Sequence, residues 1–185
     1  METLATTTNQ PYLGELTWDS DAQYRIFIVE DSSSARTLLA HYLQRLPRCQ
    51  DLQKPKIEIY SFESGEECLQ HLGLKPDIVI LDYFLNDQNQ EAMDGLALLR
   101  TIRRTLPSTD VIMMSSQQEV MIVAELFNNG ITEYVAKEHA CHVRVEQAVL
   151  RIFKEKKQAV RRRNRMMLAG VLCFIVGLAL GGWLL

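Results

Sequence analysis

Residues 76–83 decide the fold, and they read Pro76-Asp77-Ile78-Val79-Ile80-Leu81-Asp82-Tyr83. An uncharged run, rich in β-branched residues, leads here into a single carboxylate. Such a run is typical of a strand buried on both faces of a parallel sheet. Asp82 then lies at the carboxyl end of the strand, which is the edge where ligands bind in open α/β sheets. Taken alone, a carboxylate in this place is either a helix or turn cap or a functional group.

Four other short stretches predict strands, at residues 24–29, 56–61, 110–115 and 131–136. Between them, apolar residues repeat at three and four positions, which indicates amphipathic helices. Strands and helices alternate five times along the chain, so the sequence predicts an α/β fold. We expect a flavodoxin-like, doubly wound, five-stranded parallel sheet in the order 2-1-3-4-5, with residues 56–61 near an edge.

Polar side chains follow four of these five strands. Glu30 and Asp31 end the first strand, Asp82 the third, Ser115 the fourth and Lys137 the fifth. Because all the strands run the same way, these side chains share one edge of the sheet. Strands one and three are neighbours in the predicted order, so three carboxylates should lie within a few ångströms of one another.

Carboxylates this close repel one another, and a hard divalent cation relieves the repulsion. Mg²⁺ prefers oxygen ligands and is commonly held by one or two carboxylates together with a phosphate. Lys137 adds a point charge and Ser115 a hydroxyl donor, and both suit a phosphoryl group better than a carbonyl. No member of the set indicates function alone, but the arrangement as a whole does.

On these residues the chain resembles the receiver domain of bacterial two-component response regulators (CheY-like), over residues 24–153. The matching pieces are Ile28-Val29-Glu30-Asp31, Ile78-Val79-Ile80-Leu81-Asp82, Met93-Asp94-Gly95-Leu96, Met114-Ser115 and Glu133-Tyr134-Val135-Ala136-Lys137.

The resemblance implies that Asp82 is the phosphoacceptor, served by a histidine kinase or a phosphotransfer protein. It implies that Glu30, Asp31, Asp82 and the backbone carbonyl of Phe84 hold Mg²⁺. Ser115 and Lys137 would contact the phosphoryl group, and Ser115 and Tyr134 would form the conformational switch. The chain would then be a phosphorylated signalling switch rather than an enzyme.

The sequence departs from the family pattern in three places. Glu30 stands where Asp is commoner, the loop from Asp82 to Gly95 is long and lacks the usual proline, and Glu138 replaces a proline after Lys137. None of these changes removes a reactive group. Phe84 cannot orient an attacking water by hydrogen bonding, so we expect slow self-dephosphorylation, with Gln117 as the nearby polar candidate.

Charge is distributed unevenly along the chain, whose net charge is −3. Residues 1–150 hold 22 acids and 12 bases, which argues against a nucleic-acid partner, whereas residues 151–165 hold 8 bases and one acid. Residues 166–185 carry no charge and have the length of a membrane-spanning helix. The positive-inside rule then predicts a single-pass protein of the bacterial inner membrane with a cytoplasmic receiver domain.

The expected organisation is a flexible segment at 1–23, the receiver domain at 24–153, a basic juxtamembrane helix at 154–165 and a transmembrane helix at 166–185. Residues 154–185 would contact membrane lipid, the basic ones through anionic headgroups. Gly177 and Gly181 form a G-x-x-x-G pattern, which either marks a homodimer seam or reflects the frequency of small residues in membrane helices. The four cysteines show no metal-binding spacing, and no signal peptide is evident at the N-terminus.

Two other functions stay open beside a membrane-tethered phosphoacceptor. One is a membrane-anchored adaptor with a receiver-like fold that works without phosphorylation, for which Glu138 is the supporting irregularity. The other is an aspartyl-phosphate hydrolase, which would usually carry a second acid two residues after the nucleophile, where this chain has Phe84.

Overall fold

The computed structural model describes residues 23–46, 56–85, 92–116 and 120–181 of the 185-residue chain. Within these ranges, the side chains of residues 120–121 and 168–181 are not described. Gln117 and most of the segment expected to be flexible, residues 1–22, therefore lie outside the described residues.

One five-stranded sheet forms the centre of the domain, and all of its described pairings are parallel. Its strands are β1 (Gln23–Val29), β2 (Lys56–Phe62), β3 (Ile78–Asp82), β4 (Asp110–Ser115) and β5 (Glu133–Ala136), in the order β2-β1-β3-β4-β5. This confirms the predicted order and places β2 at an edge. Every residue of β3 is buried, as expected for a central strand covered on both faces.

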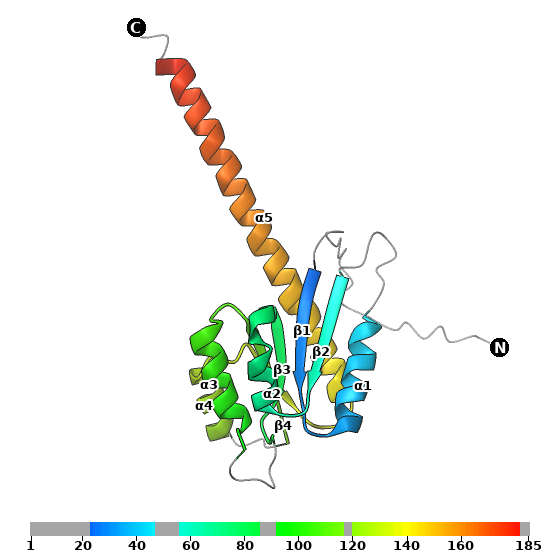
Figure 1. The fold of residues 1–185 in the computed structure, drawn as a ribbon. Coiled ribbons are helices and arrows are strands. Elements are labelled where there is room, and N and C mark those ends of the chain that lie inside the picture. The colour runs from blue at the N-terminus through cyan, green and yellow to red at the C-terminus, as the bar shows by residue number, and fades with distance from the viewer. Residues whose placement is uncertain (1–22, 47–55, 86–91, 117–119, 182–185) are drawn as a thin grey trace, which may run out of the picture.

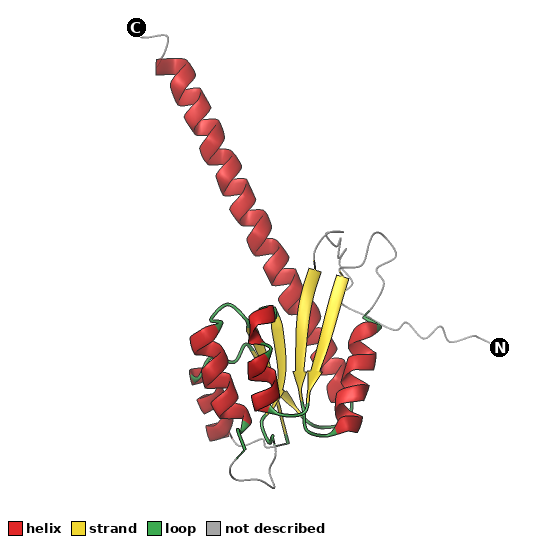
Figure 2. Cartoon of the chain, in the orientation of Figure 1, coloured by secondary structure: helices red, strands yellow, loops and turns green. Residues whose placement is uncertain are grey.

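Helices cover both faces of the sheet (Figure 2). α1 (Ser33–Gln44) and α5 (Cys141–Gly181) pack on one face, around a core that includes Ile28, Ile80 and Phe153. α2 (Gly65–Gln70), α3 (Gly95–Thr105) and α4 (Val120–Asn128) pack on the other, around Phe27, Leu81 and Leu99. A short 3₁₀ helix, η1 (Leu72–Leu74), follows α2. The two cores use alternate residues of the same strands, as the pleat requires.

Element ends differ from the predictions by a few residues. The first strand begins at Gln23, inside the segment expected to be flexible. α1 begins after Ser32, whose hydroxyl accepts a hydrogen bond from the Ala35 N–H, and it ends at Gln44. β5 begins at Glu133 rather than at Ile131, because the Thr132 hydroxyl takes the N–H of Val111 in place of a backbone carbonyl.

α5 is one continuous helix of 41 residues, and it extends well beyond the domain (Figure 1). Its first turns are fixed to the sheet: Phe153 stacks on Tyr24 with 4.1 Å between ring centroids, and Lys156 forms an ion pair of 2.8 Å with Asp110. The last helix of the domain and the basic block at 154–165 are thus parts of the same helix.

The predicted transmembrane helix at 166–185 is not confirmed. Within the residues that the structure describes, no helix is both long enough and apolar enough to cross a membrane. The side chains of residues 168–185, which include Gly177 and Gly181, are outside the described set.

Candidate functional site

Three carboxylates meet at the carboxyl edge of the sheet. β1 leads into Glu30 and Asp31, and β3 ends in Asp82, with Val29 paired to Leu81 in the register of the two strands. One carboxylate oxygen from each of these acids lies within 4.8 Å of the other two. Glu30 and Asp82 are almost fully buried, whereas Asp31 is exposed. The predicted clustering of Glu30, Asp31 and Asp82 is thereby confirmed.

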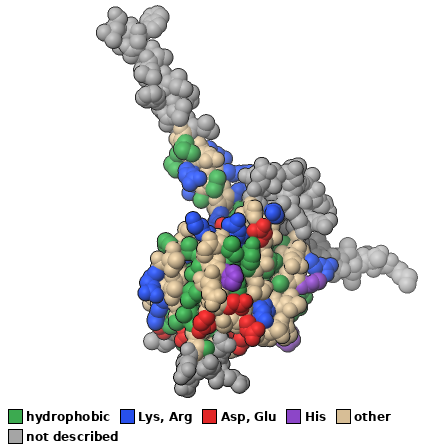
Figure 3. Space-filling model, viewed as in Figure 1, with side chains coloured by type: hydrophobic (Ala, Val, Ile, Leu, Met, Phe, Trp, Pro, Cys, Tyr) green, Lys and Arg blue, Asp and Glu red, His purple; other side chains and the backbone are tan. Residues whose placement is uncertain are grey.

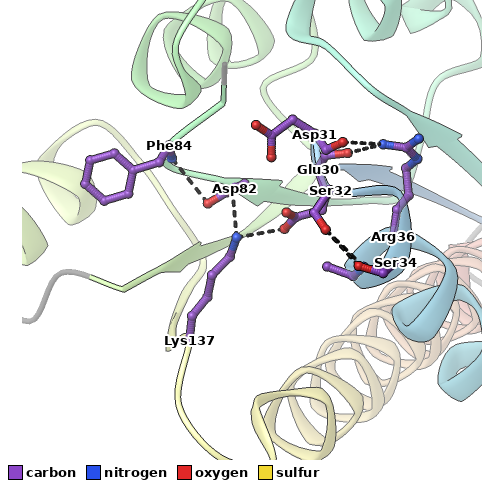
Figure 4. Close-up of polar contacts among 9 residues, drawn as sticks. Glu30, Asp31, Ser32, Ser34, Arg36, Asp82, Phe84 and Lys137 are labelled. Atoms are coloured by element: carbon purple, nitrogen blue, oxygen red, sulfur yellow. Dashed lines mark hydrogen bonds and ion pairs between the residues drawn. The ribbon is translucent and has the colours of Figure 1, made fainter. Parts of the chain in front are cut away.

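Lys137 closes the cluster from the end of β5 (Figure 4). Its Nζ donates to Oδ2 of Asp82 at 2.6 Å and to Oε2 of Glu30 at 2.8 Å. The backbone positions this side chain, because the N–H of Lys137 donates to the carbonyl of Ser115 at 2.7 Å and continues the β4–β5 pairing. Lys137 therefore bridges the two buried acids.

Burial and charge act on the pKa values of these groups in opposite directions. Burial raises the pKa of Glu30, and the hydrogen bond from Lys137 offsets this only in part. Burial alone would lower the pKa of Lys137, but its bonds with Asp82 and Glu30 outweigh burial and raise it. At neutral pH one ammonium thus faces buried acids that need a positive charge nearby.

Phe84 lies next to the acceptor position. Its backbone N–H donates to Oδ1 of Asp82 at 3.2 Å, so both carboxylate oxygens of Asp82 are engaged. The part of the Phe84 carbonyl in metal binding stays a prediction.

Ser115 and Tyr134 are the other two predicted site residues. Ser115 is completely buried at the end of β4, and Tyr134 is partly buried on β5. Burial raises the pKa of Tyr134, while a hydrogen bond with Ser115 lowers it. The two predicted switch residues are therefore in direct contact.

Three residues that the sequence analysis did not assign support the site. Arg36 donates to the backbone carbonyls of Glu30 and Asp31, which holds the turn after β1. Glu66 accepts from the N–H of Met93 at 2.7 Å, and Asp94 caps α3 by accepting from Ala97 at 2.7 Å. The N-cap pattern of Asp94 was available in the sequence, but Arg36 and Glu66 look like ordinary polar positions on helices.

Gly95 fixes how closely α3 approaches β3. A Cβ built on Gly95 would lie 2.3 Å from the carbonyl oxygen of Asp82 and 2.9 Å from that of Tyr83. Only a glycine allows the helix to begin this near the end of the strand. The start of α3 is thereby packed directly against the backbone of Asp82.

The fold and this arrangement of acids and lysine define a class of protein. The chain belongs to the response regulator receiver domain family, whose model matches residues 26–148. Receiver domains are the phosphoacceptor components of two-component signalling systems.

Similar proteins support the assignment. The protein-glutamate methylesterase/protein-glutamine glutaminase 3 of Geobacter sulfurreducens is 29% identical over 149 residues, which cover 80% of this chain and 36% of that protein. The DNA-binding transcriptional regulator NtrC of Klebsiella pneumoniae is 31% identical over 112 residues, 60% of this chain and 21% of that protein. The chain therefore spans well under half the length of these curated relatives.

Among solved structures, the signal receiver domain of a Luxo repressor protein from Vibrio parahaemolyticus is 25% identical, with a TM-score of 0.61 over 74% of this chain and 95% of that one. The response regulator DrrB of Thermotoga maritima is 24% identical, with a TM-score of 0.59 over 72% of this chain and 54% of that one, and this likeness concerns the fold.

Proposed function

We propose that this chain is a phosphoacceptor response regulator, and that Asp82 accepts a phosphoryl group from the phosphohistidine of a histidine kinase or phosphotransfer protein. One observation carries the proposal: Asp82 ends a buried central strand with Lys137 at 2.6 Å and two further carboxylates beside it. If Asp82 were only a helix or turn cap, neither Lys137 nor the other two carboxylates would be needed beside it.

The residues fit a magnesium ion. In an octahedral site with Mg–O distances of about 2.1 Å, oxygens on opposite sides are about 4.2 Å apart, so a cluster spanning 4.8 Å needs only a small contraction. Glu30, Asp31, Asp82 and the carbonyl of Phe84 would hold the ion. When bound, it would supply positive charge beside the phosphoryl oxygens.

The side chains of the site have distinct parts in the transfer. A carboxylate oxygen of Asp82 attacks phosphorus in line, the P–N bond to the donor histidine breaks, and an acyl phosphate forms. Lys137 leaves its ion pair with Asp82 and offsets the charge of the phosphoryl oxygens. The Ser115 hydroxyl turns from Tyr134 toward the acyl phosphate, and Tyr134 then repacks between β5 and α4.

The proposal is tested on the full chain in mild detergent with Mg²⁺ and acetyl phosphate, followed by intact mass spectrometry. One added phosphoryl group is expected. Asp82→Asn should abolish it, whereas Asp94→Asn, at the same edge, should not, because Asn caps a helix as well as Asp does. If the folded wild-type chain gains no phosphoryl group, the protein is an adaptor that works without phosphorylation.

Lifetime is a second property of the proposed acyl phosphate. Phe84 offers no side-chain hydrogen bond to a water near Asp82, so self-dephosphorylation should be slow. A phosphoryl half-life of seconds in the purified protein would contradict this.

We also propose that residues 154–185 tether the domain to the bacterial inner membrane, with the domain on the cytoplasmic side. The support comes from the sequence, in which 20 uncharged residues follow the basic block. The chain should stay in the membrane pellet after carbonate extraction. Recovery in the supernatant would contradict the tether.

A further inference from the structure

Charge is divided between the two ends of the domain. Helices of a parallel α/β domain run antiparallel to the strands, so the amino ends of the strands and the carboxyl ends of the helices form one edge. α5 leaves the domain at that edge, and the phosphoacceptor site lies at the other (Figure 1). Figure 3 shows Lys and Arg side chains gathered where α5 leaves, and Asp and Glu side chains gathered toward the opposite end.

The edge at which α5 leaves the domain, called the exit edge below, carries bases from several separate elements. Lys56 begins β2, Lys75 follows η1, Arg104 lies in the last turn of α3, and Lys154 lies on α5; all four are exposed. Within the described part of the chain, Lys75, Arg104 and Lys154 form no ion pair.

Most of the described acids at this same edge have a partner. Asp110 binds Lys156 at 2.8 Å, Glu133 binds Arg151 at 2.5 Å, and Glu58 lies 3.3 Å from both Arg25 and Lys56. Asp77 accepts a hydrogen bond from the Arg25 N–H at 3.0 Å, and Glu155 is exposed beside Lys154. Among the described residues of this edge, bases outnumber acids, so the charge that these residues present to solvent is positive.

The phosphoacceptor edge has the opposite character. Asp31, Glu63, Glu66 and Asp94 are exposed there. Its described bases are engaged with acids: Arg36 with Glu63, Lys137 with Glu30 and Asp82, and Arg144 with Glu138. An anionic surface would attract the exit edge and repel the phosphoacceptor edge.

The stretch of α5 between the domain and the uncharged segment is short enough for the exit edge to lie close to a lipid surface. Lys156 pairs with Asp110 at the start of β4, and the uncharged segment begins at Met166, so about 15 Å of helix separates these two residues. The headgroup layer on one side of a bilayer takes up about 5–8 Å of this length. The exit edge then lies within about one Debye length, roughly 8 Å, of the lipid surface.

We propose that the exit edge, through Lys56, Lys75, Arg104 and Lys154, is a docking surface for an anionic lipid bilayer. The inference rests on the proposed tether and adds a surface of the domain itself to it. Docking holds the domain upright, with Asp82 at the end remote from the membrane. Each base near an anionic surface contributes about a fivefold increase in the preference for the docked state.

The test places a fluorescent amino acid at Gly73 or at Glu63 in the full chain. Gly73 lies at the exit edge, and a Cβ there would meet nothing within 4 Å; Glu63 lies at the opposite edge, with 72% of its side chain exposed. Each protein is reconstituted into vesicles with a headgroup-labelled acceptor lipid, made of phosphatidylcholine alone or with phosphatidylglycerol. Energy transfer to the acceptor reports how close each edge lies to the surface.

With anionic lipid, transfer from position 73 should rise and transfer from position 63 should fall, and 0.5 M salt should reverse both. Lys75→Glu with Arg104→Glu should abolish the response to anionic lipid, by about 25-fold or more in the docked preference. Arg100→Glu with Arg144→Glu changes the charge equally away from the exit edge and should leave the response intact.

Tight insertion into both vesicles with no difference between lipids would overturn the docking surface and leave the tether standing. A chain that fails to insert overturns both. Binding of duplex DNA to the exit edge at lower concentration than anionic vesicles would assign the surface to nucleic acid and overturn the lipid proposal.

Discussion

Replacing Lys137 with methionine should remove the only ammonium that the structure places between Glu30 and Asp82. The side chain is 26% exposed, whereas those of Glu30 and Asp82 are 2% and 4% exposed. Removing one partner of a fully buried ion pair costs about 3–5 kcal/mol. Because Lys137 keeps some contact with water, and methionine preserves most of its apolar stem, we expect Lys137→Met to lower the free energy of unfolding by about 2–4 kcal/mol at pH 7.5.

The loss should depend on pH with a defined sign. Glu30 has a pKa above its ordinary value of 4.5, and without Lys137 this pKa rises further. An acid with a raised pKa destabilises the fold when ionised, and this cost disappears as the pH falls through the raised value to 4.5. The difference between wild type and variant should therefore shrink by at least half between pH 7.5 and pH 4.5.

Urea unfolding followed by circular dichroism measures the effect, with and without Mg²⁺. Mg²⁺ should stabilise the variant more than the wild type, since the ion supplies the missing positive charge. Lys75→Met is the matched control, because Lys75 is exposed at the opposite edge, and it should change stability by about 0.5 kcal/mol at most. Equal stability of Lys137→Met and wild type at pH 7.5, or a loss that does not vary with pH, would refute the electrostatic account.

Further substitutions test the packing that positions the site. Gly95→Ala should destabilise the domain by about 1–3 kcal/mol in the same assay, because its Cβ meets the Asp82 carbonyl, whereas Gly73→Ala should be neutral; equal effects would contradict the contact. Asp94→Ala should cost about 1 kcal/mol through the lost cap of α3, and Asp94→Asn should restore it. Phe153→Ala should cost about 3–5 kcal/mol, since the ring is fully buried against Tyr24; a smaller loss would mean that α5 is held mainly by its ion pairs.

The sequence was sufficient for the sheet and for the meeting of the acids. Strand β3 is uncharged until Asp82, and the order of a doubly wound sheet brings the end of β1 beside it, so the position of Glu30 and Asp31 follows from topology. The same argument places Lys137 at this edge, but it does not predict that Lys137 bonds to both Glu30 and Asp82. Which acids a lysine reaches depends on side-chain rotamers, which no strand pattern encodes.

Features that depend on individual hydrogen bonds were not predictable. Thr132 carries a strand-forming side chain, yet its hydroxyl takes the place of a ladder acceptor and delays β5 to Glu133. Arg36 reads as a polar position on α1, and its hold on the turn after β1 requires the folded geometry. Short-range patterns report periodicity and caps, whereas these contacts arise from where separate elements meet.

Because α5 is one continuous helix, a small rotation of its first turns would move its far end by a larger distance. From Lys157 to Gly181 the helix is about 36 Å long, and it continues α5 without a break. A tilt of about 5° at the domain displaces the far end of such a rod by about 3 Å. β5 bears Tyr134, and α5 is the next helix along the chain. If the proposed repacking of Tyr134 tilted α5 by this angle, the far end of the helix would move by about an atomic diameter.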